Sequence, residues 1–89
     1  MRITRIDFEG SSKMAGYYAT AKRKRYSDHI EVEILTPETP DGKIHHVKAD
    51  CEEDIRSMAE CIFFHLNGNE GTNSDVHDYY LELLKLSDI

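Results

Sequence analysis

A stripe of apolar residues between Ala49 and Gly68 constrains the fold of this chain more than any other feature. Its members recur at spacings of three and four, and because successive residues of a helix lie about 100° apart, these spacings collect them on one face. The stripe consists of Cys51, Ile55, Met58, Ala59, Ile62 and Leu66. Such a face must be buried against a second layer, so the sequence predicts a helix over 49–68 packed on the rest of the fold.

Both ends of this predicted helix carry terminal signals. Asp50 can accept hydrogen bonds from the first free backbone N–H groups, and Glu53, three residues later, completes a capping-box pattern. Asn67-Gly68 favours the left-handed backbone that ends many helices. We therefore expect the helix to begin after Asp50 and to stop at Gly68.

The segments before this helix have the composition and periodicity of strands. The clearest is His29 to Thr36, where apolar and polar residues alternate. The four predicted strands are Met1 to Phe8, Met14 to Tyr26, His29 to Thr36 and Lys43 to Ala49. Pro37, Pro40 and Asp41-Gly42 are expected to break the chain before the fourth strand.

A two-residue turn at Ser27-Asp28 sets the expected register between the second and third strands. The cross-strand pairs that it predicts are Tyr26 with His29, Lys24 with Glu31 and Lys22 with Glu33. Opposite charges then face each other on one side of the sheet. Arg23 and Arg25 fall on the other side, where their stems can cover apolar surface.

A second helix is predicted to begin near Thr72 to Asp75 and to end near Ser87. Its apolar face comprises Val76, Tyr79, Tyr80, Leu83 and Leu84. Strands followed by helices indicate an α+β fold. We expect a single domain over 1–89, with a four-stranded antiparallel sheet followed by two helices packed on one face, in the order ββββαα.

The composition bounds the function. The chain has 89 residues, of which 39% are hydrophobic, enough to form a core. Its formal net charge of -6 repels nucleic-acid backbones in general. Its longest apolar run, Cys61 to Phe64, is far too short to span a bilayer. We expect a soluble, cytoplasmic protein, monomeric or a weak homodimer. No catalytic motif is present, so neither enzymatic activity nor a cofactor is expected.

Two alternative sites follow from local patterns. Lys22, Arg23, Lys24 and Arg25, near several tyrosines, form the only dense basic cluster and are the candidate nucleic-acid site. Strand alternation divides these charges between two faces, which disfavours that site. Cys61 and His65 lie four residues apart, an acceptable spacing for two ligands of one metal. A structural zinc site needs further ligands, with His45, His46 and His77 as the available donors.

The remaining candidate is a protein-binding surface. Phe64 lies about 180° from Ile55 on the first helix, on the side that carries Glu53 and Glu60, and Leu81 lies off the apolar face of the second helix. Packing between the two helices can cover Phe64 and Leu81. If they are exposed, an aromatic anchor in an acidic field suits a basic protein partner.

The order of elements, the length and the acidic balance resemble small phage-encoded anti-CRISPR proteins that inhibit type I systems. The points of likeness are Met1-Arg2-Ile3-Thr4-Arg5, the junction Lys48-Ala49-Asp50-Cys51-Glu52-Glu53 and the glycine-containing connection between the helices. The likeness is architectural and transfers no binding residue. It implies non-catalytic blocking of a larger assembly that handles nucleic acid. We therefore expect an acidic protein-interaction module, with an inhibitor of phage or mobile-element type as one form of it.

Overall fold

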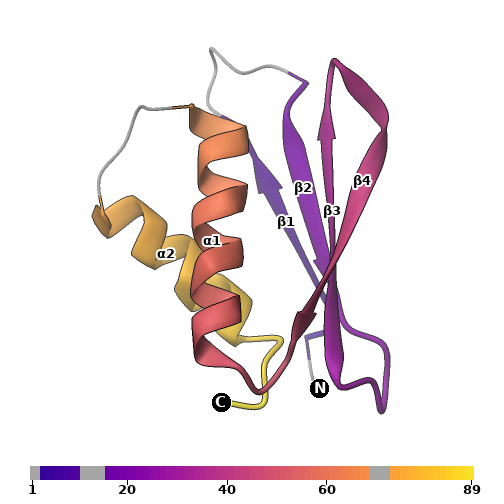
Figure 1. The fold of residues 1–89 in the computed structure, drawn as a ribbon, viewed down its shortest axis with the longest axis vertical. Helices are drawn as coiled ribbons and strands as arrows, with labels where there is room; N and C mark the ends of the chain where they lie inside the picture. Colours follow the sequence, from indigo (N-terminus) through magenta and orange to yellow (C-terminus); the bar gives the residue numbers. More distant parts are fainter. Residues whose placement is uncertain (1–2, 11–15, 69–72) are drawn as a thin grey trace.

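The computed structural model describes residues 3–10, 16–68 and 73–89, which form two layers (Figure 1). The elements are β1 (Arg5–Glu9), β2 (Tyr18–Lys22), β3 (His29–Thr36), β4 (Thr39–Lys48), α1 (Glu52–Asn67) and α2 (Asn73–Leu84). The strands form one antiparallel sheet in the order β1-β2-β3-β4, and both helices lie on the same side of it. The predicted α+β fold, with four strands followed by two helices, is confirmed. No helix in the described ranges has the length and hydropathy needed to cross a membrane.

The predicted apolar stripe of α1 provides one half of the core. Ile55, Ile62 and Leu66 have no exposed surface, while Cys51 and Met58 lie half-buried at its margins. Facing it, the inner side of the sheet buries alternate residues of neighbouring strands. These include Phe8 of β1, Ala19 and Ala21 of β2, and Ile30, Val32 and Ile34 of β3. The sequence pattern thus predicted the α1 stripe and the inward residues of β3, but it did not single out Phe8, Ala19 or Ala21.

The two ends of α1 differ from each other in how well the sequence predicted them. Cys51, not Asp50, is the N-cap residue, and no side chain caps the first turn. The prediction for Asp50 was wrong because the helix begins one residue later, leaving Asp50 exposed in the turn before it. The predicted stop is confirmed: Gly68 has φ 65° and donates its N–H to the Phe64 carbonyl at 2.9 Å.

The predicted register between β2 and β3 was wrong. Lys22 lies opposite Glu31, and β2 ends there, so Lys24 has no place in the ladder. The connection from residue 23 to residue 28 is longer than a two-residue turn and contains a turn of its own, in which the Ser27 N–H donates to the Lys24 carbonyl at 3.1 Å. The predicted start of β2 at Met14 lies outside the described residues.

The hairpin between β3 and β4 is tighter than predicted. Its loop is Pro37-Glu38, and β4 resumes at Thr39, so Pro40 lies within the strand. Proline cannot donate a backbone hydrogen bond to a neighbouring strand. It is tolerated there because β4 is an edge strand. Gly42, with φ 75°, lies beside the register shift between β3 and β4.

Two more predicted boundaries lie outside the described residues. The described part of the first strand begins at Arg5, and the predicted start at Met1 lies outside the described residues. The second helix begins at Asn73; Thr72 lies outside the described residues. Above β1, the rings of Phe8 and Tyr79 lie 5.0 Å apart, which ties α2 to the edge of the sheet opposite β4.

Candidate interaction surface

The outward ridge of α1 carries three of the residues predicted to bind a partner. Glu53, Glu60 and Phe64 are all exposed, and their spacing of seven and four residues places them along one line of the helix. Phe64 has 53% of its surface exposed. The ridge therefore presents an aromatic ring beside carboxylates, on the side of α1 turned away from the core.

Two adjacent phenylalanines have opposite environments on α1. Phe63 is buried and packs edge-to-face on Tyr79 of α2, with ring centroids 5.4 Å apart. Phe64, one position further round the helix, is left at the surface and touches Phe63 with its ring 6.1 Å away. Packing between the helices covers Phe63 and not Phe64, so the alternative in which the second helix covers Phe64 is excluded.

Leu81, the fourth residue predicted to bind a partner, lies on α2 and is 45% exposed. Helix packing does not cover it either. It belongs to a different element from Phe64. The predicted four-residue surface consists of a ridge of three on α1 and one leucine on α2.

Most of the charge near the ridge is negative. The first turn of α1 contains Glu52, Glu53 and Asp54. Their negative charges interact favourably with the positive end of the helix dipole. Arg56 pairs with Glu52 at 3.7 Å and stacks over the ring of Tyr80 at 4.5 Å. Within the described ranges, Glu53 and Glu60 take part in no ion pair, and their carboxylates remain available to a cation.

The four basic residues of the candidate nucleic-acid site have three different environments. Lys22 ends β2 opposite Glu31. Arg23 turns inward and has only 12% of its side chain exposed, whereas Lys24 and Arg25 are exposed on the connection to β3. The predicted division of these charges between two faces of a strand was wrong, because β2 stops before three of them.

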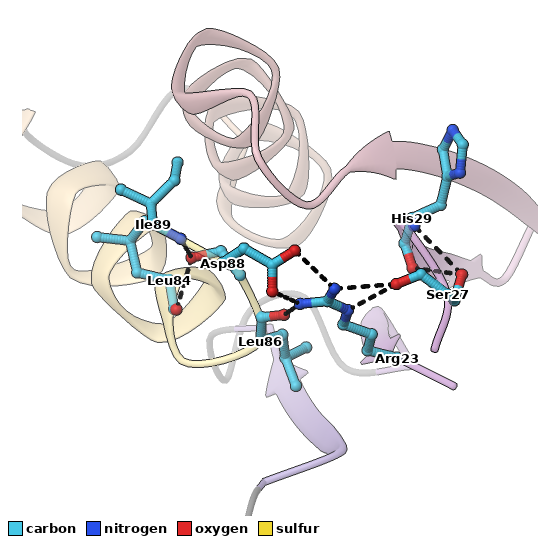
Figure 2. A network of polar contacts seen from close by, with 8 residues as sticks. Arg23, Ser27, His29, Leu84, Leu86, Asp88 and Ile89 are labelled. Atoms are coloured by element: carbon cyan, nitrogen blue, oxygen red, sulfur yellow. Dashed lines mark hydrogen bonds and ion pairs between the residues drawn. The ribbon is translucent and has the colours of Figure 1, made fainter. Parts of the chain in front are cut away.

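Arg23 is the centre of a polar network that the sequence did not indicate (Figure 2). Its guanidinium forms a bidentate pair with Asp88, with N–O distances of 2.7 and 2.8 Å. It also donates to the Leu86 carbonyl at 2.9 Å and twice to the Ser27 carbonyl, at 2.9 and 3.1 Å. Residues after α2 are thereby fixed to the connection between β2 and β3.

The candidate metal ligands Cys61 and His65 lie together on the flank of α1 next to β4. The Cys61 Sγ is 3.6 Å from His65 Nδ1, and that nitrogen donates to the Cys61 carbonyl at 2.8 Å. With the proton on Nδ1, the lone pair of the neutral ring lies on Nε2. Among the described residues, no three potential ligands gather closely enough to hold an ion.

The three other histidines proposed as metal donors lie apart. His46 is near His29 on the sheet, with ring centroids 6.4 Å apart, and His77 is near Tyr80 on α2, 5.9 Å away. His45 interacts electrostatically with His65. Burial lowers the pKa of His45, with Lys43 and His65 adding to the effect.

The Cys61 thiol is poorly suited to act as a nucleophile. Burial raises the pKa of Cys61, and the opposing charge of Lys43 does not reverse the shift. The thiol is therefore protonated at neutral pH, which makes it a weak nucleophile. This flank of α1 has the character of packing surface.

Comparison of the chain with protein-family models, curated proteins and solved structures gave no match.

Proposed function

We propose that this protein is a small non-catalytic interaction module that binds a basic surface of a partner protein through the α1 ridge. The observation that carries the proposal is the exposure of Phe64 on the same line of α1 as Glu53 and Glu60, two exposed carboxylates that form no ion pair with any described residue. A large aromatic side chain buried on binding supplies most of the affinity at many interfaces. Glu53 and Glu60 supply the acidic rim.

Charge complementarity determines the class of partner. The chain has a net charge of -6, and the ridge adds unpaired carboxylates to that field. Such a surface attracts a basic partner over long range and repels an acidic one. A basic protein that handles nucleic acid fits this description, and blocking such a protein is the mode of action that we propose.

The test compares wild type with Phe64→Ala in affinity capture from source-cell lysate, followed by mass spectrometry and direct titration of the captured protein. Phe64→Ala should weaken binding at least about ten-fold, since the anchor is removed from the centre of the contact. Ile44→Ala is the matched control, because Ile44 is 50% exposed on β4. Melting curves establish that each variant is folded.

Charge reversal provides a second measurement on the same partner. Glu60→Lys should slow association and reduce its dependence on salt, because electrostatic steering acts mainly on the association rate. Binding that survives Phe64→Ala, or that Ile44→Ala removes equally, would overturn the proposed surface.

A further inference from the structure

Tyr26 has a backbone conformation that the packing of the fold does not explain. Its φ is 67°, and it is the only residue in the described ranges, glycine aside, with positive φ. It occupies the third position of the turn from Lys24 to Ser27, where a positive φ normally requires glycine or asparagine. The side chain is 92% exposed, so burial of the ring does not compensate for the strain. Such outliers concentrate at functional sites.

The Arg23 network holds this turn in place. Two of its hydrogen bonds reach the carbonyl of Ser27, the residue that follows Tyr26, and the same guanidinium is fixed by Asp88 and by the Leu86 carbonyl (Figure 2). The ring therefore projects from a turn that is fixed from inside the fold. A fixed aromatic loses less conformational entropy on binding than one on a loose loop.

Two exposed cations lie next to Tyr26 in the chain. Lys24 and Arg25 are exposed and form no ion pair with any described residue. The Arg25 guanidinium lies 5.1 Å from the centre of the Tyr26 ring. Of the nearby acidic residues, Asp88 is paired with Arg23. Asp28 contacts His29 at 2.6 Å but is 92% exposed, so its negative charge also lies beside the turn.

A groove of about 620 Å³ runs beside this turn, and its walls carry cationic, aromatic, apolar and acidic side chains. The lining residues are Ile3, Thr4, Arg23, Lys24, Arg25, Tyr26, Ser27, Asp28 and Asp88. Pockets of a few hundred Å³ accommodate ligands of small-molecule size, so the groove fits a ligand segment of a few units.

We propose that the turn from Lys24 to Ser27 and this groove bind a short single-stranded nucleic-acid segment. The Tyr26 ring stacks on a base, and the Lys24 and Arg25 cations contact the flanking phosphates. Stacking requires bases free of a duplex, and two unpaired cations are too few to hold a duplex against a net charge of -6. The proposal is independent of the α1 ridge and adds a second surface to the protein.

The experiment measures fluorescence anisotropy of a labelled ten-nucleotide single strand, titrated with protein at low salt. Tyr26→Ala should weaken binding at least about ten-fold, the effect expected of losing one stacked base. Tyr26→Gly should weaken it equally while raising the melting temperature, since glycine adopts positive φ without strain. Loss of binding in a more stable protein cannot be attributed to unfolding.

Matched controls separate this site from general effects. Tyr18→Ala removes another exposed tyrosine and should bind as wild type. The reversal Lys24→Glu with Arg25→Glu should abolish binding, whereas Lys43→Glu with Lys48→Glu, which makes the same change in net charge, should leave most of it. The slope of log affinity against log salt should be about -1.4 for two phosphate contacts.

Several outcomes would overturn the proposal. These are no binding by wild type at low salt, equal loss in Tyr18→Ala, or binding of an acidic peptide in place of the oligonucleotide. Phe64→Ala should bind the oligonucleotide normally, so failure here is distinguishable from failure of the α1 ridge.

Discussion

Asp7 and Thr20 are paired across the outer face of the sheet. The Thr20 hydroxyl donates to Asp7 Oδ1 at 3.0 Å, and the Arg5 Nε donates to the same oxygen at 3.1 Å. The Thr20 hydrogen bond, followed by that of Arg5, holds the pKa of Asp7 below its ordinary value of 3.8. The folded state therefore favours the ionised carboxylate more than the unfolded chain does.

The first prediction concerns acid stability. Because the folded pKa of Asp7 is lowered, its stabilising contribution is present above pH 3.8 and is lost as the pH falls below it, through the folded pKa. Asp7→Asn should lower the melting temperature at pH 6 and flatten its decline between pH 5 and about pH 3. Asp41→Asn, an exposed acid on β4, is the control. Parallel pH profiles for wild type and Asp7→Asn would contradict this role.

The second prediction concerns the centre of the core. Ile62 has no exposed surface, so Ile62→Ala should cost about 2–5 kcal/mol of unfolding free energy from the lost burial and the resulting cavity. Chemical denaturation measures this directly. Glu60→Ala, two residues away on the exposed side, should change stability by less than about 0.5 kcal/mol. Equal stabilities for the two variants would refute the core position of Ile62.

At the scale of elements, two glycines end or bend regular structure for the same backbone reason. Gly42 in β4 and Gly68 after α1 have φ of 75° and 65°. They differ in available space: a Cβ at Gly42 meets the Glu33 side chain at 2.9 Å, while one at Gly68 meets nothing within 4 Å. Both glycines have a positive φ, and only at Gly42 would an added Cβ also be crowded by a neighbouring side chain.

The third prediction uses this difference. Gly68→Ala should lose about 1–3 kcal/mol, because Gly68 has φ 65° and ψ -141°, a backbone conformation that side chains disfavour. Gly42→Ala should lose stability from its positive φ, with an added cost for moving the Glu33 side chain. The double variant Gly42→Ala with Glu33→Ala should recover that added part in a double-mutant cycle. No recovery in the double variant would show that β4 relaxes around the new side chain.

Local periodicity was sufficient to predict the elements themselves. The bounds of β3 were predicted residue for residue, and the stripe of α1 was predicted because helical spacing is a short-range property. The register between β2 and β3 was not predicted correctly. Arg23 leaves the strand and forms hydrogen bonds with partners 63 and 65 residues further along the chain. No local pattern contains that information.

The candidate surface was predictable only in part. The sequence placed Phe64 opposite the core, but its exposure depended on which flank of α1 receives α2. The structure places Phe63 on that flank and leaves Phe64 outside. The conformation of Tyr26 had no sequence signal, since nothing in the residues around it marks a left-handed position.

At the scale of the whole molecule, Arg23 joins the connection between β2 and β3 to the residues after α2. The fourth prediction is that Arg23→Met lowers the unfolding free energy by about 1–3 kcal/mol, because the Ser27 and Leu86 carbonyls lose their donor. Lys85→Met removes an exposed ion pair with Glu82 and should cost less than about 1 kcal/mol. Equal losses would mean that the network contributes no more than a surface pair.

The order β1-β2-β3-β4 has a kinetic consequence. Each strand pairs with its neighbour in the chain, and the two helices are also consecutive, so contact order is low for a sheet-containing protein. The chain can form these neighbouring contacts before its two ends meet. The link between Arg23 and Asp88 spans 65 residues and is expected to close after the folding transition state. Its loss should therefore shorten the lifetime of the folded state while leaving the folding rate unchanged.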